Sequence, residues 1–249
     1  MQVANIKTNI IEKAETDTCR KSREAAATVS AKANKKVRPF SYRFWKNIMD
    51  RFLALAGIIV AAPVMGIIAL IIKFDSKGSA IYRREQVGEN GDYFTAFKFR
   101  TMTENNDDSV YREYMARYIK EGVPYAIDEE GKPVYKVIND TRVTRFGALL
   151  RKTNLDELPQ LFNILRGEMS WVGPRPDVPL AVSMYQAWHM KRLAIRPGLT
   201  GLWQVSGRKN LNFQDMVRLD IEYIRKQSLL LDAKIFLLTV VTILKRDGS

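Results

Sequence analysis

The chain has 249 residues, which is enough to bury one sizeable hydrophobic core or two small ones. Its single cysteine, Cys19, excludes an internal disulfide, and its single histidine, His189, argues against a histidine-based metal site or a Ser/His/Asp triad. The formal net charge of +13 favours a polyanionic partner, either nucleic acid or the acidic surface of a membrane.

Residues 1–43 are basic and polar. No sustained apolar period runs through residues 1–38, so the sequence predicts no packed core there. We expect a disordered N-terminal extension over residues 1–43, or at most a loose surface helix.

Residues 52–72 form an uncharged, apolar run between Arg51 and Lys73 that is long enough for a membrane segment. The run is too long, and starts too far into the chain, for a cleaved signal peptide. Pro63 near its middle must remove one backbone hydrogen bond. Basic residues flank both ends, so the positive-inside rule gives no orientation. Two structures stay open: a tilted span kinked at Pro63, or a helix over residues 44–77 that bends and leaves by the face it entered.

After the membrane segment the apolar period becomes strand-like. Residues 79–84 and 93–99 alternate as strands do, and the Asn-Gly pair at 90–91 suits the turn between them, which predicts a small β-hairpin. Lys98 and Arg100 share one face of the second strand. This pair predicts either a diphosphate-binding site or an ordinary solvated basic face.

The acidic segment that follows Arg151 is the most informative part of the chain. Asp156 and Glu157 precede an apolar helical period, Pro159 is tolerable only in a first turn, and Gly167 ends the period, so we expect a helix beginning near Asp156. Its apolar face would comprise Leu158, Leu161, Phe162 and Leu165. The positive end of the helix dipole would then favour an anion beside the two acids, and neighbours on a helix suit different roles. The alternative is an N-cap at Asp156 and a solvated acid at Glu157.

Two arginines lie next to prolines. Arg175 stands between Pro174 and Pro176, and Arg196 precedes Pro197. A residue before proline is restricted to extended backbone, so each arginine is presented by a stiff loop. A guanidinium held in this way suits bidentate recognition of phosphate. Any metal beside such phosphates would be a hard cation with oxygen ligands, and magnesium is the natural candidate.

Further helical periods follow along the chain. Residues 107–121 and 180–193 are expected to be helical, and Asn212 with Asp215 is typical of another helix start. Residues 235–244 are strongly apolar but too short to span a bilayer. They predict either an interfacial helix or a buried core helix.

The order of these motifs resembles the bacterial sugar transferase family, the monotopic phosphoglycosyl transferases that act on polyprenyl phosphate. The resemblance covers about residues 44–246. The matching positions are Lys46, Asp50, Pro63, 98–102, 142–147, 155–161, 170–176, 196–201, Gln204, Gly207, Arg208, Asp220 and Tyr223. Ala62 departs from the pattern, because a serine often precedes that proline in the family.

The resemblance implies a reaction and a set of roles. The family transfers a sugar 1-phosphate from a UDP-sugar to polyprenyl (undecaprenyl) phosphate and releases UMP, the first membrane step of surface polysaccharide synthesis. Asp156 would be the nucleophile that forms a glycosyl-phospho-aspartate, Glu157 would assist it, and Mg²⁺ would bridge the diphosphate near Asp156. The residues implied around the phosphates or nucleotide are Lys98, Arg145, Arg151, Arg175 and Arg196, with Asp220 and Pro63 in supporting roles.

The fold class that follows is mainly α with a small β-hairpin (α+β), in a monotopic membrane protein. The family's re-entrant helix would occupy residues 44–77, and residues 78–249 would form a catalytic domain with an interfacial C-terminal helix. This domain would lie on the cytoplasmic face of the bacterial inner membrane. The expected partners are a UDP-sugar, polyprenyl phosphate and inner-membrane lipids, and a homodimer is compatible with the sequence.

Two other functions compete with this one. A nucleic-acid-binding module would explain the charge, but the basic residues lie beside a membrane helix and the aromatic residues form no stacking platform, so we expect no nucleic-acid partner. An inactive membrane scaffold would keep the helices and lose the acids, whereas Asp156, Glu157, Arg151 and Arg175 are all present.

Overall fold

The computed structural model of the chain describes residues 40–103, 109–127, 131, 133–135, 142–206 and 211–244. Within these residues the protein is mainly helical with three small two-stranded sheets, which confirms the predicted α+β class. Up to residue 39, the predicted N-terminal extension lies outside the described residues, and residues 40–43, which were included in that extension, instead begin a helix. With η marking a 3₁₀ helix, the elements are α2 (Phe40–Asp75), β1 (Ile81–Val87), η1 (Glu89–Gly91), β2 (Tyr93–Phe99), α3 (Ser109–Glu121), β3 (Ala126–Ile127), β4 (Pro133–Val134), α4 (Arg145–Thr153), η2 (Leu155–Glu157), α5 (Gln160–Arg166), β5 (Ser170–Val172), α6 (Pro179–Ser183), η3 (His189–Ala194), β6 (Gly198–Thr200), α7 (Leu202–Ser206), α8 (Phe213–Lys226) and α9 (Leu229–Leu244).

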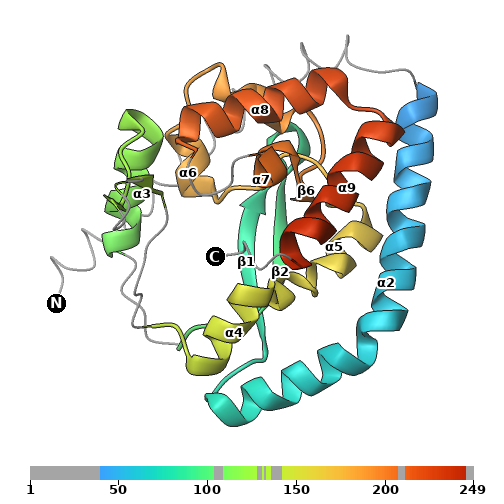
Figure 1. The fold of residues 1–249 in the computed structure, drawn as a ribbon, viewed down its shortest axis with the longest axis vertical. Helices are drawn as coiled ribbons and strands as arrows, with labels where there is room; N and C mark the ends of the chain where they lie inside the picture. The colour runs from blue at the N-terminus through green and yellow to red at the C-terminus, as the bar shows by residue number, and fades with distance from the viewer. Residues whose placement is uncertain are drawn as a thin grey trace, which may run out of the picture.

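Helix α2 is bent. Its first half runs along one side of the molecule, and its second half turns beneath the other elements (Figure 1). Pro63 lies inside the helix and removes one of its backbone hydrogen bonds, which is a physical reason for a bend. By length and composition, Ser41–Asp75 could cross a membrane. The proline break is therefore present in the fold, whereas re-entry into a bilayer stays a prediction.

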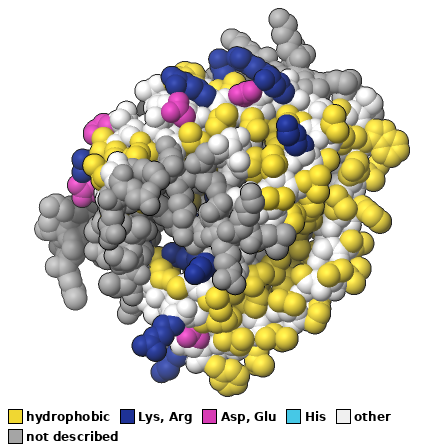
Figure 2. Space-filling view, viewed as in Figure 1, with side chains coloured by type: hydrophobic (Ala, Val, Ile, Leu, Met, Phe, Trp, Pro, Cys, Tyr) yellow, Lys and Arg dark blue, Asp and Glu magenta, His cyan; other side chains and the backbone are white. Residues whose placement is uncertain are grey.

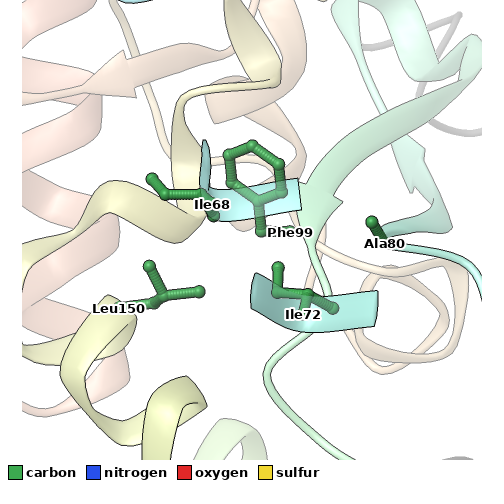
Figure 3. Packing of buried hydrophobic residues seen from close by; sticks show 5 residues of the cluster. All are labelled: Ile68, Ile72, Ala80, Phe99 and Leu150. Carbon is green, nitrogen blue, oxygen red and sulfur yellow. The ribbon is translucent and has the colours of Figure 1, made fainter. Parts of the chain in front are cut away.

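The second half of α2 packs against β2 and α4. Ile68 and Ile72 meet Phe99 and Leu150, with Ala80 beside them (Figure 3). None of the five residues is more than 8% exposed. Full burial of a large apolar side chain contributes about 1.5–3 kcal/mol, so this cluster holds the bent part of α2 in place.

The hairpin agrees with the sequence prediction. β1 and β2 pair in antiparallel fashion, with Ile81 opposite Phe99. The turn between them uses Asn90 and Gly91 in left-handed conformations, with φ of 59° and 84°. The first strand begins two residues later and ends three residues later than expected.

The two candidate acids lie in a short 3₁₀ turn and not in the first turn of a helix. Asn154 is the C-cap of α4, and its φ of 56° redirects the chain into η2. α5 then begins at Gln160, so the expected helix start near Asp156 is wrong by about one turn. Pro159 is the cap before α5, where its missing N–H costs nothing. Gly167 ends α5 as predicted.

Two other helix predictions differ from the structure. Phe162, expected in the buried face of α5, is 41% exposed, whereas the polar Asn163 is fully buried. Residues 180–193, expected as one helix, form the separate elements α6 and η3. Between them the ring of His189 accepts a hydrogen bond from the backbone N–H of Gln186 at 3.0 Å, which replaces the bond pattern of a continuous helix.

The parallel strands β5 and β6 bring the two arginine–proline turns together. Ser170 pairs with Gly198, and the turns that follow and precede these strands meet at Gly173. A Cβ on Gly198 would lie 2.1 Å from the nitrogen of Gly173, so only glycine fits. Part of the predicted loop at 196–201 is therefore a strand.

Helices α2 and α9 share an apolar outer surface. α9 lies beside the first half of α2, and apolar side chains form a band along the edge of the molecule that these helices make (Figures 1 and 2). In α9, Ile235 is buried, but Leu230 and Leu237 are 82% and 64% exposed. In α2, Phe52 and Val60 are 69% and 78% exposed. α9 is thus not a core helix, and its exposed face fits the interfacial alternative.

Candidate active site

Glu157 of η2 is held by two cations from different parts of the chain. Its Oε1 atom lies 2.7 Å from Nζ of Lys98 on β2 and 2.5 Å from Nη2 of Arg175. Nη1 of Arg175 reaches Oε2 at 3.5 Å. Burial opposes ionisation of Glu157, but Arg175 and Lys98 hold its pKa well below the ordinary range. Glu157 is therefore ionised at neutral pH and orients both cations.

Asp156, the neighbouring acid, has a different environment. Among the described residues, no group forms a hydrogen bond or an ion pair with its carboxylate. Burial raises the pKa of Asp156, and the nearby charge of Lys98 is the largest influence that lowers it. Arg175 and Arg151 lower this pKa further, while Glu157 raises it. The carboxylate therefore sits in a positive field with its lone pairs available to a ligand or an electrophile.

Two leucines explain how η2 presents these acids. Residues three apart eclipse each other in a 3₁₀ helix, so Leu155 and Leu158 lie on one side of the turn. Both pack against the apolar cluster beneath β2 and α4. The acids between them are only partly buried. The turn thus has one apolar side fixed to the core and one polar side.

Asn163 of α5 fixes the strand that carries Lys98. Its Nδ2 donates to the carbonyl oxygen of Thr95 at 2.7 Å, and its Oδ1 accepts from the N–H of Phe97 at 3.1 Å. Sequence reasoning did not single out this residue. The available signal was a polar side chain inside the apolar period of a short helix.

Arg151 and Arg145 lie at opposite ends of α4. Nε of Arg151 donates to Oγ1 of Thr101 at 2.9 Å, and the charge of Arg151 acts on Asp156. Arg145 is exposed in the first turn of the helix. We call η2, with Asp156 and Glu157, the acidic turn. The structure therefore brings Arg151 to the acidic turn and leaves Arg145 at the far end of α4.

Asp220 on α8 is connected to the loop of Arg175 through Arg192. Nη2 of Arg192 lies 2.7 Å from Oδ2 of Asp220 and donates to the backbone carbonyl of Arg175 at 3.0 Å. Burial raises the pKa of Asp220 to about 7, and Arg192 opposes this rise. Asp220 thus reaches the loop of Arg175 through Arg192, a residue that the sequence pattern did not single out.

Arg196 points to α2 and not to the acidic turn. Its Nη1 donates to Oδ1 of Asn47 on α2 at 2.9 Å. Close by, Oγ of Ser170 on β5 donates to Asp50 of α2 at 2.7 Å. The two arginine–proline turns are adjacent, but Arg175 holds Glu157 whereas Arg196 holds α2.

A buried polar cluster joins α2 to α8 and α9. Nζ of Lys46 lies 2.8 Å from Asp232 of α9 and 3.8 Å from Asp50. The hydroxyls of Tyr42 and Tyr223 lie 3.0 Å and 2.6 Å from the Asp232 carboxylate. We call Lys46, Asp50, Asp232 and the two tyrosines the anchor cluster, because it fixes the first half of α2.

Comparison with known proteins places this arrangement in a family. The family described as bacterial sugar transferase matches residues 41–246. The chain belongs to the bacterial sugar transferase family. This membership confirms the resemblance drawn from the motifs, and as a member the protein is a transferase.

Several bacterial sugar transferases are similar to this one. The exopolysaccharide production protein ExoY of Sinorhizobium fredii is 40% identical over 204 residues, which are 82% of this chain and 87% of ExoY. The undecaprenyl-phosphate galactose phosphotransferase of Salmonella typhimurium is 39% identical over 84% of this chain. The UDP-glucose:undecaprenyl-phosphate glucose-1-phosphate transferase of Xanthomonas campestris pv. campestris is 35% identical over 80% of it. The chain spans only 42% and 38% of these last two proteins.

The donor set of this sugar transferase fits a magnesium ion only in one way. Among the described residues, no three acidic, histidine or cysteine side chains converge. Glu157 is occupied by Lys98 and Arg175, whereas Asp156 offers an unpartnered carboxylate. Magnesium is commonly bound through one or two carboxylates together with the phosphates of a substrate. Asp156 therefore fits as the protein ligand of a cation that arrives with a diphosphate. The matching positions Gly207 and Arg208 lie outside the described residues.

Proposed function

We propose that this sugar transferase moves a sugar 1-phosphate from a UDP-sugar to polyprenyl (undecaprenyl) phosphate and releases UMP. The names of two relatives describe galactose and glucose phosphate transfer involving undecaprenyl phosphate, which supports this substrate class. The observation that carries the proposal is the contrast between two adjacent acids. Glu157 is fully engaged by cations, whereas Asp156 has no partner among the described residues.

Asp156 is the nucleophile in this scheme. Its carboxylate oxygen attacks the β-phosphorus of the UDP-sugar, and the bond from that phosphorus to the oxygen bridging the two phosphates breaks. UMP leaves with the bond electrons, and the sugar phosphate stays on Asp156 as an acyl phosphate. Attack by a fixed carboxylate divides one difficult reaction between two anions into two steps.

The lipid completes the cycle. A phosphate oxygen of polyprenyl phosphate attacks the same phosphorus, and the bond from phosphorus to the Asp156 oxygen breaks. The product is a polyprenyl diphosphate sugar, and the Asp156 carboxylate is restored. No proton has to be supplied by Glu157, which agrees with its lowered pKa.

The cations around the acidic turn stabilise the charge that these steps move. Lys98 and Arg175 are oriented by Glu157, and Arg151 is tied to Thr101. Fixed cations at a transferring phosphoryl group need no reorganisation during the reaction. Mg²⁺ bound at Asp156 would neutralise charge on the diphosphate. Arg145 and Arg196 lie outside this group, so we assign the phosphate contacts to the other three cations.

We infer that the acidic turn works at the cytoplasmic face of the bacterial inner membrane. The apolar band of α2 and α9 supports a location in the bilayer surface (Figure 2). Both halves of α2 expose apolar side chains, with Ile59 at 66% and Ile67 at 61%, so both fit a lipid environment. The bend at Pro63 supports re-entry, which would leave the cluster of Ile68 and Ile72 beside the turn. A lipid-bound acceptor would then meet the nucleophile at the membrane surface.

Release of UMP from a panel of UDP-sugars in the presence of undecaprenyl phosphate tests the proposal. Asp156→Asn should lower UMP release by at least about 10³-fold, because an amide cannot form the acyl phosphate. Asp215→Asn, which changes an exposed acid on α8, should leave the rate unchanged. Full turnover by Asp156→Asn would exclude the nucleophile assignment.

A further inference from the structure

Arg192 of η3 is a buried cation that the proposed chemistry does not touch. It is 3% exposed, and its two terminal nitrogens meet four groups. Nη1 lies 2.6 Å from Oδ2 of Asp177 and 2.7 Å from the hydroxyl of Tyr185. Nη2 lies 2.7 Å from Oδ2 of Asp220 and donates to the backbone carbonyl of Arg175 at 3.0 Å. One guanidinium therefore joins the loop of Arg175 to η3 and α8.

We propose that Arg192 is a positioning residue, which sets the place of the Arg175 guanidinium at Glu157 by holding the backbone carbonyl of Arg175. This role rests on the proposed function, because it concerns the same site. Arg192 does not contact the substrate. It acts through Arg175 alone.

The loop of Arg175 is held at both of its ends by backbone hydrogen bonds. The N–H of Gly173 donates to Thr200 at 2.9 Å, and the carbonyl of Asp177 accepts from Val87 at 2.9 Å. Pro174 and Pro176 restrict the backbone on either side of Arg175. The bond from Arg192 fixes the middle of this stiff loop. A small displacement there moves the whole Arg175 side chain, since the loop has little freedom to compensate.

The choice of arginine has a chemical reason. A planar guanidinium meets groups along two edges at once, whereas a lysine ammonium is a point donor that cannot span them. Asp177 in the loop of Arg175 and Asp220 on α8 offset the buried charge. Stability alone gives a weak reason to bury such a group, because well-packed apolar residues often serve equally well. The geometry points instead to placement of the Arg175 carbonyl.

The test is a double-mutant cycle on the full chain in lipid vesicles, with UMP release as the readout. Arg192→Lys should lower kcat by about 100-fold, the effect of a displacement of about 1 Å at a catalytic group. In an Arg175→Lys background the same change should cost less than about threefold, because the positioned group is already lost. Arg218→Lys, a matched change at a residue 71% exposed by side chain, should be silent in both backgrounds.

A merely structural role would give a different pattern. Loss of folded protein lowers turnover by the same factor in both backgrounds, so equal losses would overturn the positioning role. If Arg192→Lys melts below the assay temperature, Tyr185→Phe removes one contact of Arg192 at almost constant volume. It should lower kcat by about threefold to tenfold in the wild-type background only. A wild-type protein that releases no UMP over the whole panel would overturn both the proposed function and this role, whereas equal losses from an active wild type would overturn only the role of Arg192.

Discussion

The acidic turn and the anchor cluster contain the same kinds of side chain but differ in how completely the acids are paired. In the anchor cluster, Asp232 binds Lys46 and two tyrosines, and Asp50 binds Ser170. In the acidic turn, Glu157 is equally engaged, but Asp156 is unpartnered among the described residues. A fully paired cluster fixes one element against another. A cluster with one unpaired acid in a positive field can react.

The contrast between the regions predicts that both acids of the turn matter for activity but only Glu157 matters for stability. Glu157→Gln should lower kcat by about 100-fold, because Lys98 and Arg175 lose the group that orients them. It should also lower the free energy of unfolding by about 1–3 kcal/mol, a value reduced by the solvent around Arg175. Asp156→Asn should lower activity further but leave the melting temperature unchanged, since it breaks no bond. Thermal melting together with UMP release measures both effects.

The pH dependence of stability separates an acid paired in a partly buried site from an acid in an exposed ion pair. The folded-state pKa of Glu157 is lowered, so its contribution to stability is present above its ordinary pKa of about 4.3 and is lost as the pH falls below that value. Between about pH 5 and pH 3, the wild type should therefore lose melting temperature more steeply than Glu157→Gln. Glu222→Gln, an exposed acid on α8, is the control. Parallel melting curves for the wild type and Glu157→Gln would contradict the pairing.

A substitution in the anchor cluster should lower stability but leave kcat nearly unchanged. Asp232→Ala removes the carboxylate that Lys46 and Tyr223 share and should lower the free energy of unfolding by about 3 kcal/mol. The kcat of the protein that remains folded should stay within about threefold, because no residue of the acidic turn is touched. Lys234→Ala, on an exposed part of the same helix, should affect neither quantity. A loss of kcat as large as that of Glu157→Gln would remove the distinction between the two regions.

The smallest effect is expected from the proline break. In a Cys19→Ser background, single cysteines at Ser41 and Lys77 should both be labelled from the cytoplasmic face if α2 re-enters. Pro63→Ala restores a backbone donor, but the packing of the second half of α2 on β2 and α4 should keep most molecules bent. Both positions should therefore still be labelled from the cytoplasmic face in this variant. Labelling of the two wild-type positions from opposite faces would instead establish a span.

Local patterns were sufficient wherever neighbours in sequence determine the structure. The Asn-Gly turn of the hairpin, the stop at Gly167, and the cap of α8, where Asn212 accepts from the N–H of Asp215 at 2.8 Å, all follow from backbone preferences of a few residues. The long apolar helix and its break at Pro63 could likewise be predicted from the sequence. The pair at Asp156 and Glu157 was a candidate because two adjacent acids precede an apolar helical period.

The different states of those two acids were decided by tertiary structure. Glu157 meets Lys98 from 59 residues away, and Arg196 meets Asn47 from 149 residues away, and no local pattern specifies such partners. The helix begins at Gln160 and not, as predicted, near Asp156, because Leu155 and Leu158 are fixed to a core built by α2, β2 and α4. By itself the sequence therefore determined which residues could do the chemistry and that a bent apolar helix accompanies them. Only the folded chain decided which acid is paired and which has no partner among the described residues, because charge pairing depends on contacts between distant segments.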